Sequence, residues 1–103
     1  MMRIYKYRLP PTGEAITLDM PVGTEILHVH AQNDAACLWA AVNPENTRTE
    51  KRSFLVICTG ADIKMYFKAK FLGTVHLERY GLVLHVFETT TNESEALVGD
   101  KQS

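Results

Sequence analysis

The sequence predicts an all-β domain, mostly antiparallel, in which about seven strands form a small sandwich or an open barrel. Polar and apolar side chains alternate with a period of two along most of the chain, which is typical of half-buried strands. Residues that favour turns, such as Pro10, Pro11 and Gly23, separate these segments. Two further segments are apolar on both faces, and strands of that kind lie in the centre of a structure.

The first three expected strands follow from this alternation and from the residues that stop it. Arg3–Leu9 alternates and ends at two consecutive prolines, neither of which can donate a backbone hydrogen bond to a ladder. Residues 15–20 place three apolar side chains on one face. Glu25–Gln32 alternates until Asn33 and Asp34, two residues with a strong preference for turns.

The two segments that are apolar on both faces are residues 36–42 and 54–58. The polar residues 43–53 lie between them, so we expect a hairpin with a long exposed loop. Both faces of such strands need cover, either from a second layer or from a second subunit. A domain this small has few ways to supply that cover alone, and we therefore expect a homo-oligomer.

The last expected strands are residues 71–78 and 82–88, which form a second hairpin. A two-residue turn between them places His76 directly opposite His85. Residues 62–69 are ambiguous and are compatible with one short helix or with a loop. From residue 89 the apolar pattern fades, so we expect one β domain over residues 1–88 and a mobile tail over residues 89–103.

Composition and charge narrow the function classes. The chain of 103 residues has 46% apolar and 22% charged residues, as ordinary globular proteins do, which argues against wholesale disorder. The formal net charge of −1 gives no general attraction to nucleic acid, so a nucleic-acid partner is not expected. The start of the chain lacks the apolar core of a secretory signal, and the longest apolar run, residues 35–42, is far shorter than a membrane span.

The four histidines are the candidates for a metal site. His28 and His30 share one strand face about 7 Å apart, a spacing that metal sites use. His76 and His85 could add ligands from the last hairpin. Alternation gives any His-x-His strand this appearance, so the main prediction is no metal and no cofactor, with a site built on these four histidines as the alternative.

Nucleophilic catalysis has little support in the sequence, and no enzyme activity is expected. The chain has no Gly-x-Ser-x-Gly motif. Cys37 lies in an apolar run, an environment that does not favour a reactive thiolate. Cys37 and Cys58 are expected to be reduced, with a cross-strand disulfide as the alternative.

Trp39 is the strongest candidate for an interface or for the wall of a pocket. It is the single tryptophan, and small alanines beside it let a partner approach closely. Burial in the core is the alternative for this side chain.

Several short phrases occur in a fixed order along residues 3–88. They are Tyr5-Lys6-Tyr7-Arg8-Leu9-Pro10, Ile26-Leu27 leading to Gln32-Asn33, Cys37-Leu38-Trp39-Ala40-Ala41-Val42-Asn43-Pro44, Thr59-Gly60, Phe71-Leu72-Gly73-Thr74 and Leu82-Val83-Leu84-His85-Val86-Phe87-Glu88. In this order and spacing the chain resembles a family of small phage and prophage proteins of unknown function. The resemblance implies a bacteriophage accessory protein in the cytoplasm of the bacterial host, and it implies no reaction.

These observations together favour a non-enzymatic binding protein that helps a phage to manage its host. It would sequester a small nucleotide-like ligand or bind a host protein; a structural or assembly component of the virion and a metal-dependent enzyme that uses the strand histidines are the alternatives. The residues expected to contact the ligand or partner are Trp39, His85, Gln32, Asn33, Tyr5, Tyr7, Thr59 and Gly60.

Overall fold

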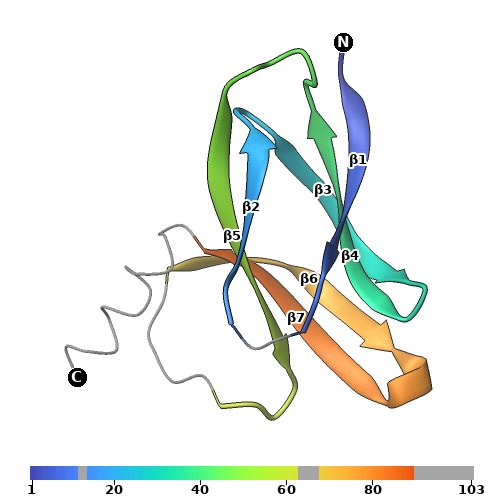
Figure 1. Ribbon diagram of the computed structural model, residues 1–103. Coiled ribbons are helices and arrows are strands. Elements are labelled where there is room, and N and C mark those ends of the chain that lie inside the picture. The colour runs from blue at the N-terminus through green and yellow to red at the C-terminus, as the bar shows by residue number, and fades with distance from the viewer. Residues whose placement is uncertain (12–13, 63–67, 90–103) are drawn as a thin grey trace, which may run out of the picture.

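Seven antiparallel strands in two sheets make up the fold (Figure 1), which confirms the predicted all-β class. The computed structural model describes residues 1–11, 14–62 and 68–89. The elements are β1 (Arg3–Leu9), β2 (Ile16–Pro21), β3 (Glu25–Gln32), β4 (Ala35–Val42), β5 (Thr49–Cys58), β6 (Ala69–Leu77), the 3-10 turn η1 (Glu78–Tyr80) and β7 (Leu82–Thr89). In this part of the chain no helix has the length and apolarity needed to cross a membrane.

Two sequence predictions concern segments that are not described. Most of the short helix expected at residues 62–69 falls on residues 63–67, outside the described residues, while Ala69 already belongs to β6. The expected mobile tail lies outside the described residues from position 90 onward.

Each sheet has its own order of strands. Sheet A has the order β1-β4-β3, and sheet B has the order β2-β5-β7-β6. Each neighbouring pair is antiparallel. β4 is therefore the centre of sheet A, whereas β5 and β7 are the centre of sheet B.

The predicted hairpin between the two apolar segments is wrong. β4 and β5 lie in different sheets, and residues 43–48 carry the chain from one sheet to the other. β5 also starts at Thr49 rather than at residue 54, because its charged first half pairs with β2: Lys51 lies opposite Asp19 and the two side chains form an ion pair of 3.0 Å. Each apolar segment is thus an interior strand of its own sheet.

The core fills the space between the sheets. The inner face of β4 contributes Ala36, Leu38, Ala40 and Val42, all fully buried. The central strands of sheet B supply the facing layer. Its buried members are Phe54, Val56, Leu84 and Val86. Alternation along β4 and β5 places these residues on one face of each strand, as in other sandwiches.

The outer face of β4 is covered in part by polar side chains of its own sheet. Cys37 points outward but is only 3% exposed. Lys6 lies opposite Trp39 and Gln32 lies opposite Ala35, so their hydrogen bond of 2.5 Å crosses β4 above Cys37. Side chains of the same chain thus shield part of the outer face of β4 from water.

The two cysteines lie in different sheets. Cys37 is on β4 of sheet A, and Cys58 ends β5 of sheet B; both are free thiols, so the alternative of a disulfide between them is wrong.

The sheets approach most closely where β3 packs along β6. A Cβ atom on Gly73 would lie 2.5 Å from the Val29 Cγ2 atom, which is too close for any real contact. The pairing of β6 with β7 shifts by one residue between Phe71 and Gly73, and such a bulge bends the strand and increases its twist. A residue without a side chain is therefore required where the two edges meet.

An ion pair lies between the sheets where the β2–β3 connection crosses. The Arg52 Nε and Nη2 atoms donate to the Glu88 carboxylate at 2.6 and 2.9 Å, and Arg52 also donates to the Thr24 carbonyl. Both charged side chains are about one-sixth exposed. The hydrogen bonds to Glu88 raise the pKa of Arg52, an effect that desolvation opposes. One guanidinium thereby joins β5, β7 and the connection between the two sheets.

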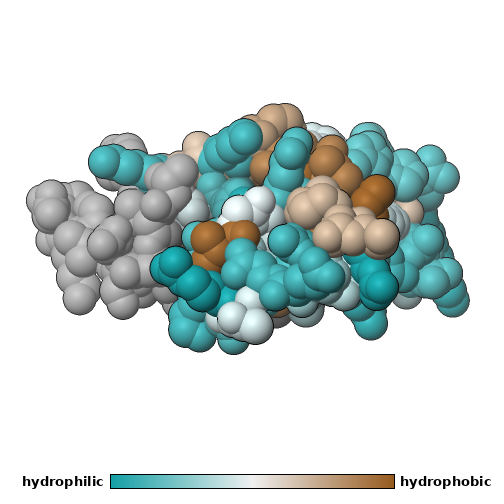
Figure 2. Space-filling model, turned by 90° about the horizontal axis from the view of Figure 1, so that it is seen from above, coloured by the Kyte–Doolittle hydropathy of each residue, from teal (hydrophilic) through white to brown (hydrophobic). Residues whose placement is uncertain are grey.

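The face of the molecule that Figure 2 shows has exposed hydrophobic residues among hydrophilic ones. This face is at the end that carries the amino terminus, and brown residues appear there among teal ones. Four of the eight large hydrophobic side chains that are exposed in the described part of the chain are Met1, Met2, Ile4 and Tyr5. Exposed apolar side chains are therefore concentrated at the amino terminus and in the first half of β1.

We expect Gly73→Ala to lower the free energy of unfolding by about 1–3 kcal/mol, because the new methyl group overpacks Val29. Urea denaturation of Gly73→Ala, Val29→Ala and the double variant measures this. The double variant should lose less free energy of unfolding than the sum of the losses in the two single variants. Additivity within about 0.5 kcal/mol would show that the two residues do not collide.

Replacing Glu88 by leucine should lower the free energy of unfolding by about 2 kcal/mol, because it leaves the charge of Arg52 without its partner between the sheets. Partial solvent exposure keeps the loss below that of a fully buried pair. The variant Arg52→Met/Glu88→Leu should recover about 1 kcal/mol of this loss in the same urea experiment. A double variant no more stable than Glu88→Leu alone would contradict this interpretation.

Candidate functional site

The residues predicted from the sequence lie at four places on the sandwich. Gln32 and Asn33 are at the end of β3 and in the turn that follows it. Trp39 is on the outer face of sheet A, and Tyr5 and Tyr7 are on β1. His85, Thr59 and Gly60 are together at one end of sheet B.

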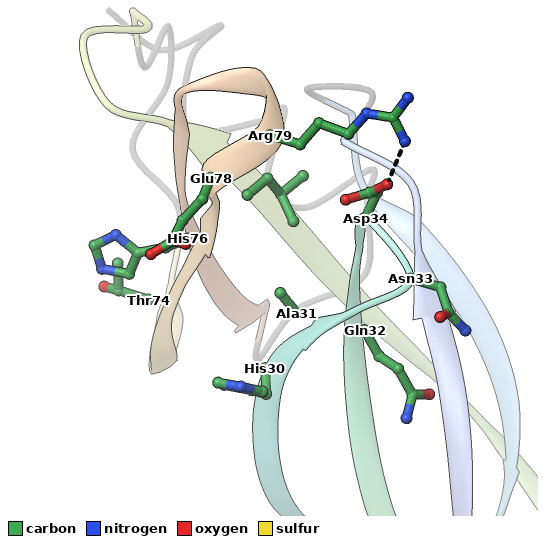
Figure 3. A pocket seen from close by; sticks show the side chains of 10 residues that line it. His30, Ala31, Gln32, Asn33, Asp34, Thr74, His76, Glu78 and Arg79 are labelled. Atoms are coloured by element: carbon green, nitrogen blue, oxygen red, sulfur yellow. Dashed lines mark hydrogen bonds and ion pairs between the residues drawn. The ribbon is translucent and has the colours of Figure 1, made fainter.

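The first of these places forms an open pocket of about 660 Å³ between the β3–β4 turn and the β6–β7 turn (Figure 3). We call it the β3–β6 pocket. Its lining consists of one segment from each hairpin: His30, Ala31, Gln32, Asn33 and Asp34 from the first, and Thr74, His76, Leu77, Glu78 and Arg79 from the second. The close approach of β3 and β6 brings these distant segments to one end of the molecule.

The first wall of the pocket depends on a tight hairpin turn. Asn33 and Asp34 have φ angles of 52° and 61°, in the left-handed region. Two consecutive residues with positive φ are typical of the type I′ turn, in which asparagine and aspartate are favoured. The same two residues that stop β3 in the sequence therefore also project polar side chains at the mouth of the pocket.

An ion pair joins the two walls. The Arg79 Nη1 atom lies 3.0 Å from the Asp34 Oδ2 atom, and the dashed line in Figure 3 marks this contact. Arg79 is 71% exposed, so its guanidinium presents further N–H donors to solvent. Solvent also weakens the pair, which therefore does not lock the turns together. Arg79 also lies over the ring of Tyr80, 5.8 Å from its centre.

The pocket offers donors and acceptors of several kinds. Arg79 is a cation, whereas Asp34 and Glu78 are carboxylates that accept hydrogen bonds. His30 and His76 add two exposed imidazoles, and Figure 3 shows them on the same side of the view as Glu78. A ligand with both an anionic group and several hydroxyl or amine groups finds partners for each.

A smaller apolar pocket of about 300 Å³ adjoins the first. Asp34 and Leu77 belong to both pockets. The rest of its lining is Arg8, Leu9, Pro10, Pro11, Ala35, Tyr80 and Leu82. The ion pair between Asp34 and Arg79 therefore lies close to both pockets, at the same end of the sandwich.

Trp39 lies beside His28 on the outer face of sheet A, and His28 in turn stacks on His30. The ring of His28 is 6.3 Å from the ring of Trp39 and 5.7 Å from that of His30, with the two imidazoles stacked. Trp39 is half-buried rather than part of the core. His30 also lines the β3–β6 pocket, so this aromatic group borders the pocket.

His85 is held between two threonine hydroxyls. The Thr59 Oγ1 atom is 2.7 Å from Nε2 of His85, and the Thr74 Oγ1 atom is 3.1 Å from Nδ1. Thr74 also lines the β3–β6 pocket, whereas His85 and Thr59 do not. Two of the candidate residues, His85 and Thr59, are therefore hydrogen-bonded to each other. Gly60 follows Thr59 with a φ of 87°, a turn conformation that favours glycine.

The predicted pairing of His76 with His85 is wrong. His76 lies opposite Val83, and Thr74 lies opposite His85. The turn has four residues rather than two: η1 and Gly81 connect Leu77 to Leu82, and Gly81 donates its N–H to the Glu78 carbonyl. The two extra turn residues shift the register by two, so His76 and His85 are diagonal neighbours.

The four histidines of the alternative metal site are not gathered in one place. His28 and His30 lie on sheet A, whereas His76 and His85 lie on sheet B. Within residues 1–11, 14–62 and 68–89, no group of three or more potential ligands is placed to hold a metal ion.

The sequence patterns did not indicate the charged residues of the pocket. They predict Asp34 and Arg79 in turns and Glu78 at the end of a strand, and they assign none of the three to the binding site. Their sequence positions are far apart, and only the packing of β3 along β6 brings them together. The available signal was that both turns carry charged residues, but no pattern in the sequence pairs one turn with the other.

Tyr5 and Tyr7 share the inner face of β1. Tyr7 packs against the core and Tyr5 is 39% exposed. Desolvation raises the pKa of Tyr7, and the nearby Tyr5 phenol adds to this effect. Neither residue lines either of the two pockets described above.

The comparisons with known proteins give one match. The model of a family described as a domain of unknown function (DUF7352) matches residues 1–96. No curated protein and no solved structure matches the chain.

The raised pKa of Tyr7 predicts that stability falls at alkaline pH. Folding favours the neutral phenol, so this contribution is intact below the ordinary tyrosine pKa of about 10 and is lost as the pH rises through the higher pKa of the folded state. Urea midpoints between about pH 8 and about pH 11 should fall less in Tyr7→Phe than in the unmodified protein. Equal losses in both proteins would contradict the assignment.

Proposed function

The chain belongs to the DUF7352 family of domains of unknown function, and we propose that it is a non-enzymatic binding protein whose β3–β6 pocket takes a small, nucleotide-like ligand. The observation that carries this proposal is the pocket itself, which two hairpin turns build at one end of the sandwich. Binding residues are commonly found on loops that a scaffold holds in this way.

The size of the pocket suits a ligand of this class. Its volume of about 660 Å³ lies within the range of about 300–1,000 Å³ that is typical of small-molecule sites. The adjoining apolar pocket extends the surface available to a planar group, with Tyr80 as an exposed aromatic side chain there. A ligand with a polar part and a flat part would use both pockets.

The chemistry of the lining supports a phosphate group on the ligand. Arg79 is strongly exposed and bonds Asp34 through one nitrogen only, which leaves donors for a phosphate oxygen. Asn33, Asp34 and Glu78 supply acceptors for the N–H and O–H groups of a base or a ribose. An apolar ligand would leave these groups without partners.

The surroundings of His85 support binding rather than catalysis. The hydrogen bond between Thr59 and His85 has the form of a nucleophile with its base, but the second nitrogen of His85 meets the Thr74 hydroxyl and not a carboxylate. Thr59 and His85 also lie outside the β3–β6 pocket.

The setting in which such a ligand is sequestered is part of the proposal. The resemblance of residues 3–88 to small phage and prophage proteins suggests an accessory role in an infected bacterium, in the host cytoplasm. Retention of a nucleotide signal would then reduce its free concentration without any reaction. A pocket shared between subunits of a homo-oligomer would act in the same way.

We expect isothermal titration calorimetry to detect binding of adenosine or guanosine monophosphates, or of cyclic dinucleotides, and weaker binding of the unphosphorylated nucleosides. Arg79→Ala should weaken nucleotide binding by about tenfold or more, because it removes a charge-assisted hydrogen bond. Arg48→Ala is a matched control, since Arg48 is an exposed arginine in the connection between β4 and β5.

Two results would overturn the proposal. One is the absence of binding for each of these nucleotides at millimolar concentration by folded protein. The other is an equal affinity of the unmodified protein and Arg79→Ala for the nucleotide that binds.

A further inference from the structure

We propose that the free edge of β1 is a docking strand for an extended, acidic segment of another protein. β1 is at the edge of sheet A and pairs with β4 alone among the described strands. In Figure 1 it forms the border of that sheet near the amino terminus. The unpaired backbone groups of such an edge are a template to which an extended peptide can add.

The other edges of the two sheets are less suited to this role. β3 and β6 pack along one another, so each covers part of the other. β2 ends in Pro21, which has no backbone N–H to offer. β1 has seven residues and no proline.

The charges on β1 select an acidic partner. Arg3, Lys6 and Arg8 are exposed, and the strand has no acidic residue. Arg3 and Arg8 form no ion pair within the described part of the chain, and Lys6 bonds only to a neutral amide, that of Gln32. Like charges on facing strands are destabilising, so the edge disfavours a second copy of β1 and favours carboxylates.

Exposed apolar side chains on the same strand indicate that the cations of β1 do more than prevent edge-to-edge aggregation. Charged residues on an edge strand commonly prevent aggregation. However, Ile4 is 63% exposed and Tyr5 is 39% exposed, on opposite faces of β1. A strand that both carries unpaired cations and exposes large apolar side chains has the composition of a binding surface.

The alternation of β1 defines the partner's pattern. Lys6 and Arg8 point to the outer face of sheet A, and Tyr7 between them points to the inner face. Residues directly opposite one another on paired strands share a face. The partner should therefore have two acidic residues separated by one apolar residue.

The test uses a labelled, capped peptide of about seven residues in which glutamates alternate with valines. We expect saturable binding by fluorescence anisotropy and no binding of the matching lysine–valine peptide. The double variant Lys6→Glu/Arg8→Glu should bind the glutamate peptide about tenfold or more weakly, and it should bind the lysine–valine peptide. Arg48→Glu, which changes a cation in the connection between β4 and β5 rather than on β1, should bind the glutamate peptide as the unmodified protein does.

N-methylated peptides separate strand pairing from general attraction, and they need no protein variant. Alternate N–H groups of a paired strand point toward its neighbour, and the others point away from it. Methylation of the nitrogens that face β1 should abolish binding. Methylation of the nitrogens that face away from β1 should leave the affinity within about twofold of that of the unmethylated peptide.

Three results would overturn the proposal. The first is equal affinity of the two methylated peptides. The second is a loss of affinity for the glutamate peptide in Arg48→Glu as large as the loss in Lys6→Glu/Arg8→Glu. The third is tight binding of oligothymidylate in place of the peptide.

Discussion

The close approach of β3 and β6 at Gly73 is the constraint on which the shape of this protein depends. The two strands belong to different sheets, and the contact has room for a hydrogen atom but not for a methyl group between Gly73 and Val29. It brings the ends of the two hairpins together and so creates the β3–β6 pocket. A wider separation of the sheets at this point would leave Asp34 and Arg79 on unrelated loops.

The second requirement of the fold is cover for two strands that are apolar on both faces. One face of each strand lies in the core. On the outer face of β4, small residues reduce the area to be shielded, and the hydrogen bond between Lys6 and Gln32 crosses above Cys37. Long polar side chains thus shield apolar surface with their methylene groups while their charged ends stay in water. A neighbouring subunit is one way to meet this need, and the chain meets part of it alone.

Alternation in the sequence was sufficient to predict where most strands lie, but not which strands pair with each other. The ends of β1 and β3 follow directly from the period of two and from the prolines and turn residues beside them. The start of β5 was missed because residues 49–53 are charged, although they alternate in register with β2. β4 was joined to β5 because the two strands are consecutive in the chain, whereas packing across the core places them in different sheets. His76 was aligned with His85 because a two-residue turn was assumed, whereas the turn has four residues.

The position of Trp39 decides what its fluorescence reports. The single tryptophan of the chain is half-buried on the outside of sheet A, against His28, and the space between the sheets has no indole. Emission during denaturation therefore follows the outer layer of one sheet, whereas circular dichroism follows the whole backbone. Coincidence of the two curves is then a stringent sign that the sheets separate and unfold in a single step, since the two probes observe different parts of the molecule.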